Sequence, residues 1–214
     1  GPPELSFVSS PAVAVCDEVI VCDDGSTVPV VINMPKVRVV RNAKALGPPA
    51  ACNAAADAAT GLYLARLDCG DKFFMSKREQ IVQHLQDGIQ ASFSITVCEK
   101  SGIKYGANPQ WQTKIYSDNV FAASGTIISR ALFKAVGGYD ESLRYCADWD
   151  FHVRVQAENG WRPVLILSGT STQWDGGHTD LWNDEQKIKR WSSDHAKVAG
   201  RARDLSHSRL PTSR

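Results

Sequence analysis

Short β-rich runs that end in acidic turns and alternate with helical segments are the feature that most constrains this fold. Residues 18–22 run into Asp23 and Asp24, and residues 62–67 run into Asp68 and Asp71. Residues 48–59 are rich in alanine, open with proline and stop before a glycine, which favours a helix. Strands that alternate with helices predict an α/β fold with a largely parallel central sheet flanked by helices.

The rest of the chain continues this alternation. Further strands are predicted at residues 4–9, 37–40, 91–98 and 163–167, and further helices at 76–87, 129–136, 148–158 and 184 to about 199. The length of 214 residues suits one large core. We expect one α/β domain over residues 1–183 and a C-terminal helix with a basic tail over 184–214.

Composition excludes several classes of protein. The net charge of +1, with 22% charged and 43% hydrophobic residues, excludes collagen-like, disordered and strongly basic nucleic-acid-binding chains. No apolar run approaches the roughly 18 residues of a membrane-spanning helix, and the first residues do not resemble a signal peptide. The six cysteines form no Cys-x-x-Cys pair, which favours reduced, buried thiols and a cytoplasmic location.

The positive charge gathers at the C-terminal end. Residues 187–214 hold eight Lys or Arg and two Asp, and residues 201–214 lack an apparent apolar period, so we expect a loose tail. The tail is either a solvated terminus or a contact with an anionic surface of lipid head groups or nucleic acid.

The two acidic turns predict a ligand site. Ligands of open α/β sheets bind beyond the carboxyl ends of the strands, where Asp23, Asp24, Asp68 and Asp71 would meet. Carboxylates gathered at one edge repel one another unless a cation lies between them, so a divalent cation that bridges to a diphosphate is one interpretation. The alternative is that each aspartate only caps a turn or a helix.

Two further residues are candidates for chemistry. Asp148 stands near the start of a predicted helix and is either a general base or a plain helix cap. His178 lies in a glycine-rich loop and is either a metal ligand or a surface residue.

Five segments, taken in order, resemble family 2 glycosyltransferases of the GT-A fold. They are EVIVCDDGST (18–27), LGPPAACNAAADAATG (46–61), YLARLDCGDKF (63–73), SGTIISRALFKAVGGYDE (124–141) and ADWDFHVR (147–154). The likeness covers roughly residues 4–180. The connection over residues 26–36 is short and holds two prolines, so the chain looks like a trimmed version of that fold.

The resemblance implies a nucleotide-sugar donor, with UDP-sugars favoured. The residues it assigns to the nucleotide and the donor sugar are Asp23, Asp24, Asn53, Arg66, Asp68 and Gly125. Cys52 stands where the family usually has an arginine, and Arg66 is a possible replacement.

The resemblance also implies a divalent metal, Mn²⁺ or Mg²⁺, on the diphosphate. Asp68, Asp71 and His178 would hold it, and Gly70 stands where the family often has an aspartate. The metal would stabilise the charge that develops on the leaving diphosphate.

The third implication is an inverting transfer with Asp148 as the base that deprotonates the acceptor hydroxyl. Asp140, Glu141 and Trp149 would lie near the acceptor, although Trp149 is at least as well explained by core packing. The acceptor could be a saccharide, a lipid-linked glycan, a protein or a modified nucleic acid.

Two other functions remain open at this point. One is a binding module that descends from this fold and has lost catalysis, which Gly70 and Cys52 would mark, although such a module has no need of Asp148. The other is a nucleotidyltransferase, which usually has a glycine-rich phosphate loop near its N-terminus, and residues 1–15 show none.

Overall fold

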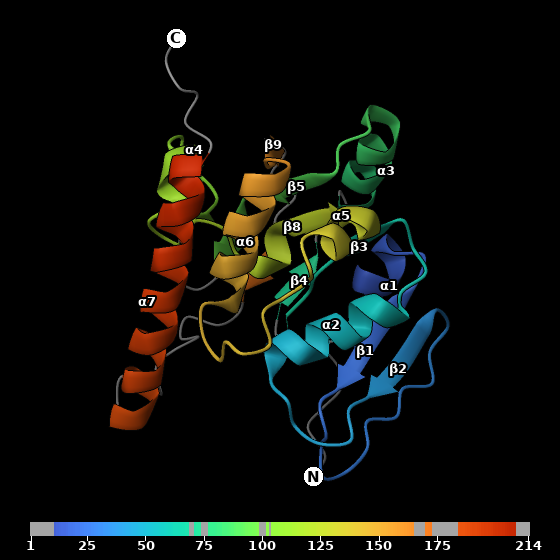
Figure 1. Cartoon of the computed structure of the whole chain (residues 1–214). Coiled ribbons are helices and arrows are strands. Elements are labelled where there is room, and N and C mark those ends of the chain that lie inside the picture. Colours follow the sequence, from blue (N-terminus) through green and yellow to red (C-terminus); the bar gives the residue numbers. More distant parts are fainter. Residues whose placement is uncertain are drawn as a thin grey trace.

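The computed structural model describes residues 11–68, 71–73, 77–98, 102, 104–164, 170–172 and 184–208 (Figure 1). The helices are α1 (Pro11–Val15), α2 (Pro48–Ala58), α3 (Lys77–Asp87), α4 (Trp111–Lys114), α5 (Arg130–Ala135), α6 (Ala147–Glu158), α7 (Glu185–Ser208) and the 3-10 turn η2 (Ala123–Gly125). The strands are β1 (Val19–Asp23), β2 (Val37–Arg41), β3 (Tyr63–Ala65), β4 (Asp71–Phe73), β5 (Ala91–Ser94), β6 (Thr96–Cys98), β7 (Lys104–Tyr105), β8 (Thr126–Ser129), β9 (Arg162–Val164) and β10 (Thr170–Thr172). The expected α/β class is confirmed.

The strand expected at residues 18–22 and the helix expected at 48–59 form as β1 and α2, whereas the strand expected at residues 4–9 lies outside the described residues. β1 and β2 pair in parallel, from Val19 opposite Val37 to Asp23 opposite Arg41. The crossover over residues 24–36 contains no helix, although parallel crossovers usually include one. α2 packs on this pair, and two prolines occupy its first turn, where a backbone N–H has no helical partner anyway (Figure 1). The end of β1 therefore lies close to the start of α2.

The remaining described strands form mixed sheets, ordered β3-β8-β5-β9 and β4-β10-β6-β7. β8 runs antiparallel to both β3 and β5, whereas β5 and β9 are parallel, as are β6 and β10. These sheets differ in this respect from the largely parallel arrangement that we expected. One reason is β8, which enters between β3 and β5 just before the helix expected at residues 129–136 and was not itself expected, and the other is the antiparallel pairing of β4 with β10 and of β6 with β7.

The main core joins β5, β8, α5 and α6. Its buried side chains include Phe93 and Ile128 from the sheet and Trp149, Phe151 and Val155 from α6. α6 is buried around most of its circumference, because the sheet lies on one side and α7 packs on the other (Figure 1). Among the described residues, no helix combines the length and apolar character needed to span a bilayer.

The expectation of a loose tail from residue 201 is wrong as far as residue 208. α7 continues to Ser208, and Val198 and Ala202 are buried against the core. The apolar period was present but sparse, because Trp191, Val198, Ala202 and Leu205 follow one another at wide, helical spacing among charged residues. Residues 209–214 lie outside the described part. The domain boundary at 183/184 stays a prediction.

Candidate functional site

The Asp23 carboxylate builds the loop that follows β1. It accepts hydrogen bonds from the backbone amides of Ser26 (2.9 Å) and Val30 (3.0 Å) and pairs with Arg41. The amides of Val30 and Ser26, helped by Arg41, hold the pKa of Asp23 well below its usual range. With 3% of its surface exposed, Asp23 shapes the loop, and its expected contact with the donor stays a prediction.

Asp24 ties the same loop to the start of α2. Its carboxylate accepts hydrogen bonds from Asn42 Nδ2 (2.7 Å) and from the backbone amides of Leu46 (3.0 Å) and Gly47 (2.7 Å). Burial raises the pKa of Asp24, but these hydrogen bonds outweigh burial and the pKa lies below its usual value. Protein donors therefore surround the group predicted to contact the nucleotide, and the contact itself stays a prediction.

Asn53 connects α2 to the turn that follows α5. Its Nδ2 donates to the Tyr139 carbonyl (2.9 Å) and to Glu141 (2.8 Å), and its Oδ1 accepts from the Tyr139 amide (2.9 Å). These bonds explain the residue without a nucleotide, so Asn53 positions Tyr139 and Glu141. Glu141 in turn lines a shallow pocket with Leu46, Gly47, Ser142, Leu143, Arg144 and Arg190.

Arg66 lies at the centre of the candidate site. Its guanidinium grips Asp68 through Nε (2.7 Å) and Nη2 (3.3 Å) and stacks over the Tyr139 ring at 4.9 Å. Burial lowers the pKa of Arg66, but nearby Tyr139, Asp68 and Cys52 outweigh that effect and raise it. Arg66 therefore lies beside Cys52, in the neighbourhood where the resemblance leads us to expect an arginine.

Asp68 and Asp71 lie together near η2. The Asp68 amide donates to Ser124 Oγ (2.9 Å), and Ser124 also hydrogen-bonds Asp71. Burial raises the pKa of Asp71 and the neighbouring Asp68 adds to the increase, so the site is short of positive charge at Asp71. The next residue, Gly125, has its carbonyl bound by Lys77 Nζ at 3.1 Å, and a side chain there would press on Thr96.

The described residues supply only part of a metal site. Two carboxylates suit a hard divalent cation, and the charge balance at Asp71 fits one. Within the described part of the chain, no cluster of three or more His, Cys, Asp or Glu side chains could hold a metal ion. Gly70 and His178 lie outside the described residues, so the expected third ligand stays a prediction.

Asp148 lies in the first turn of α6 and is half-buried. Asn119 donates to its Oδ2 at 2.7 Å. The other end of the Asn119 amide lies 3.1 Å from Nδ1 of His152, one helical turn beyond Asp148. The local sequence did not reveal Asn119, whereas the i, i+4 spacing of Asp148 and His152 could have indicated a shared face.

Trp149 belongs to the core. It is 2% exposed and its Nε1 donates to the Ile115 carbonyl at 2.7 Å. The packing alternative is therefore the one that the structure has, and the ring offers no open face to a sugar.

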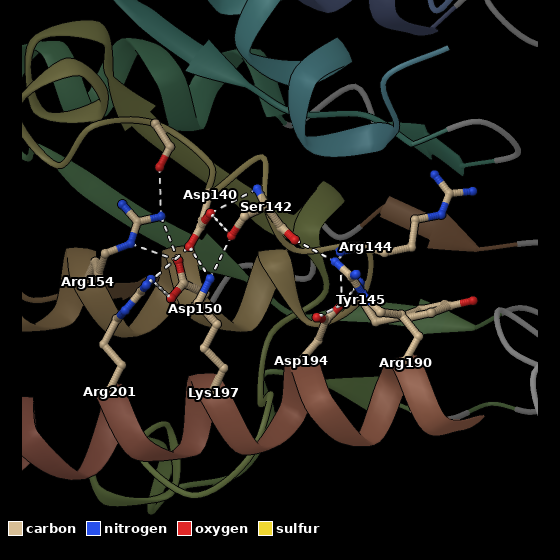
Figure 2. A network of polar contacts seen from close by, with 11 residues as sticks. Asp140, Ser142, Arg144, Tyr145, Asp150, Arg154, Arg190, Asp194, Lys197 and Arg201 are labelled. Atoms are coloured by element: carbon tan, nitrogen blue, oxygen red, sulfur yellow. Dashed lines mark hydrogen bonds and ion pairs between the residues drawn. The ribbon is translucent and has the colours of Figure 1, made fainter. Parts of the chain in front are cut away.

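Asp140 belongs to a polar network between α6 and α7 (Figure 2). It pairs with Lys197 (3.3 Å) and Arg201 (3.1 Å), and Arg201 also pairs with the fully buried Asp150. Ser142 and Arg201 contribute to a pKa of Asp140 that lies well below its usual range, although burial works against them. Asp140 therefore helps to hold α7, and its expected place in the acceptor region stays a prediction.

His152 is influenced by charged residues from two parts of the site, Arg66 near β3 and Asp148 on α6. Burial lowers the pKa of His152 to about 4, nearby Asp148 acts in the opposite direction, and nearby Arg66 adds to the decrease. Arg66 also forms an ion pair with Asp68, so the charged groups after β3 and the acid of α6 both influence the same buried ring. The structure thus brings together Arg66, Asp68 and Asp148 from the predicted set.

Comparisons with known proteins identify relatives of this chain. The family model for glycosyl transferase family 2 matches residues 16–136, more than half of the chain. A *Haemophilus influenzae* protein named as an uncharacterized glycosyltransferase is 25% identical over 206 residues, covering 88% of this chain and 70% of the relative.

Solved structures of *Staphylococcus aureus* TarS share the fold. TarS 1-349 in complex with UDP is 15% identical with a TM-score of 0.55, covering 72% of this chain and 50% of that chain. Its complex with UDP-GlcNAc is 14% identical with a TM-score of 0.56, covering 92% of this chain and 65% of that chain. The chain thus spans half to two thirds of these TarS chains. The expected GT-A fold is confirmed, and by the family match the chain belongs to glycosyl transferase family 2.

Proposed function

We propose that this protein transfers a sugar from a UDP-sugar to an acceptor hydroxyl. The observation that carries the proposal is that a family 2 chain holds Asp68 on Arg66 and holds Asp148 and His152 on the two ends of one Asn119 amide, with Arg66 near enough to lower the pKa of His152. The choice of UDP is supported by the TarS structures, which were solved with UDP and with UDP-GlcNAc.

The proposed transfer inverts the anomeric carbon, with Asp148 as general base. Asn119 engages Oδ2 of Asp148, and among the described residues no hydrogen bond engages Oδ1. Oδ1 takes the proton of the acceptor hydroxyl while the oxygen forms a bond to the anomeric carbon. The bond from that carbon to the UDP oxygen breaks on the opposite face, and the electron pair leaves with UDP.

We also propose that Asp71 and Asp68, with His178 from outside the described residues, hold a Mn²⁺ or Mg²⁺ ion. When bound, such an ion would stabilise the negative charge of the diphosphate. Arg66 already balances Asp68, so Asp71 is the carboxylate with most to gain from the ion.

The acceptor remains a saccharide, a lipid-linked glycan, a protein or a modified nucleic acid. Fewer basic side chains than expected can make the proposed contact with an anionic surface, because Arg190, Lys197 and Arg201 pair with acids of this chain. Among the described residues, the exposed Lys189 and Arg203 have no ion pair, so these two and the segment after residue 208 are left to carry the contact.

Donor binding is tested first by thermal stabilisation with UDP, GDP, CDP and ADP, each with Mn²⁺, Mg²⁺ or EDTA. A ligand that binds the native state raises the melting temperature, so a shift specific to UDP supports the donor class. A UDP shift that EDTA abolishes supports the metal, and a shift that EDTA leaves unchanged removes it. No shift with any nucleotide contradicts the proposal and favours a binding module without catalysis.

The base is tested by UDP release from the UDP-sugar that stabilises the protein best. Asp148→Asn should lower release about 100-fold or more, because general bases contribute factors of roughly that size, and should keep the UDP-induced shift. Asp57→Asn, an exposed aspartate on α2, is the matched control and should change neither quantity. Undiminished release by Asp148→Asn would show that Asp148 is not the base.

A further inference from the structure

We propose that Asn119 and His152 are positioning residues that fix the orientation of the Asp148 carboxylate. The inference rests on the proposed function, in which Asp148 is the base. The three side chains come from two places in the fold, because Asn119 precedes η2 and β8 whereas Asp148 and His152 share one face of α6.

The amide of Asn119 has a direction that its neighbours determine. Its Nδ2 lies 2.7 Å from Asp148 Oδ2, and its Oδ1 lies 3.1 Å from His152 Nδ1. A flipped amide would place two acceptor oxygens against each other, so the nitrogen end has to face the carboxylate. The oxygen end then requires a donor, and Nδ1 of His152 has to carry a proton.

The surroundings of His152 keep this proton in place. The side chain is fully buried, and its ring packs against Phe121 at 5.4 Å and Trp161 at 5.5 Å. Burial is the main reason why the pKa of His152 is about 4, so the ring is neutral near pH 7. A neutral imidazole has one N–H, which the Asn119 oxygen assigns to Nδ1.

The cost of a histidine at this position argues for a role beyond packing. Nε2 of His152 is buried and has no hydrogen-bond partner among the described residues. A buried acceptor without a partner destabilises a protein, and an apolar ring of similar size would avoid the penalty. The hydrogen bond to Asn119 is what the imidazole provides and a phenyl ring cannot.

The consequence for catalysis is geometric. Because Asn119 holds Oδ2, the carboxylate cannot rotate freely, and Oδ1 keeps a constant direction toward the acceptor side. No proton moves along the three residues. The pair lowers the cost of bringing base and hydroxyl into line, an effect that is sensitive to displacements of about 1 Å.

Two variants and one control test the role. His152→Phe keeps a ring but removes the donor to Asn119, and Asn119→Ala removes the link itself. Phe121→Leu is the matched control, because Phe121 packs on the same imidazole and makes no polar contact with Asp148. The measurements are the kcat and KM of UDP release from the best-binding UDP-sugar, and the ¹⁵N spectrum of the histidine rings in the wild-type protein.

The expected result is a fall in kcat on the order of 10-fold or more for His152→Phe and Asn119→Ala, with KM for the donor nearly unchanged. Phe121→Leu should lose stability but keep kcat. In the wild-type spectrum, His152 should stay neutral at pH 6 with its proton on Nδ1. This last measurement needs no variant to fold and no acceptor to be known.

The failures can be told apart. A proton on Nε2, or a charged His152 at pH 6, overturns the positioning role whatever the activity. If Asp148→Asn abolishes release but His152→Phe and Asn119→Ala do not lower kcat, the positioning role is wrong and the proposed function stands. If Asp148→Asn keeps full release, or the wild type releases no UDP from any UDP-sugar, the proposed function fails and the positioning role falls with it.

Discussion

The two faces of α6 carry aspartates with opposite surroundings, Asp148 and Asp150, which are separated by one residue. Asp150 faces α7, is fully buried and pairs with both Arg154 and Arg201 (Figure 2). Asp148 faces the other way, is half-buried and accepts a hydrogen bond from the neutral amide of Asn119. The first carboxylate is paired with two cations, whereas the second has no ion pair and no hydrogen bond on Oδ1 among the described residues.

This difference separates Asp150, whose ion pairs hold the fold together, from Asp148, which we propose as the general base. Arg154 also binds the carbonyls of Val136 and Gly138, so the Asp150 network fixes the turn that carries Tyr139 over Arg66. The α7 face thus holds the site in shape, and the opposite face presents Asp148 to it. A substitution on the α7 face should therefore lower mainly the stability, and a substitution on the Asp148 face should lower mainly the activity.

The largest effect is expected from Asp150→Asn. The variant leaves two guanidinium groups facing a neutral amide in a buried place, which typically costs about 3–5 kcal/mol of unfolding free energy. Asp148→Asn is the control, with a change below about 1 kcal/mol, because its site is half-buried and carries no ion pair among the described residues. Urea denaturation of both measures the difference. Equal losses would remove the distinction between the faces.

The next largest effect is a loss of stability in acid, and it comes from His152 on the Asp148 face of α6. Unfolded His152 takes up a proton below pH about 6.5, whereas burial delays this in the folded protein until about pH 4. Stability should therefore fall as the pH drops from 6.5 to 4, by roughly 3 kcal/mol from this residue.

His152→Phe should make this acid slope shallower in urea denaturation at several pH values. Part of the slope should remain, because burial also lowers the pKa of His84. An unchanged slope would show that His152 takes up its proton at about the same pH in the folded and the unfolded protein, and the predicted neutral ring at pH 6 would be wrong.

The sequence pattern predicted those features that depend on contacts between residues close together in the chain. The acidic turn after β1 and the helix after it follow from residues 18–59, because the donors that bind Asp24 lie within about one crossover of it. The pattern also placed Asp148 at the start of its helix. It could not distinguish a carboxylate that contacts a ligand from one that accepts hydrogen bonds from its own loop, as Asp23 does.

Contacts between distant segments were beyond the sequence. Arg66 reaches Tyr139, Asn119 reaches Asp148, and Arg201 reaches Asp140, and each pair is separated by dozens of residues. The insertion of β8 between β3 and β5 is of the same kind, since pairing partners are not encoded in a strand's own period. The acids of the site therefore acquire their separate roles only when α6 and α7 pack.

The smallest of these effects tests how much the ion pairs from α7 stabilise the α7 face of α6. Arg201→Gln removes one cation from Asp150 and one from Asp140, but Arg154 and Lys197 remain on those acids. The loss should be about 1–2 kcal/mol, below that of Asp150→Asn, since neither carboxylate is left bare. Arg203→Gln, two residues on and exposed, should change stability by less than about 0.5 kcal/mol. Equal urea midpoints for the two variants would mean that the ion pairs of Arg201 do not help to hold α7, and these pairs would then have no part in keeping the α7 face of α6 distinct from the Asp148 face.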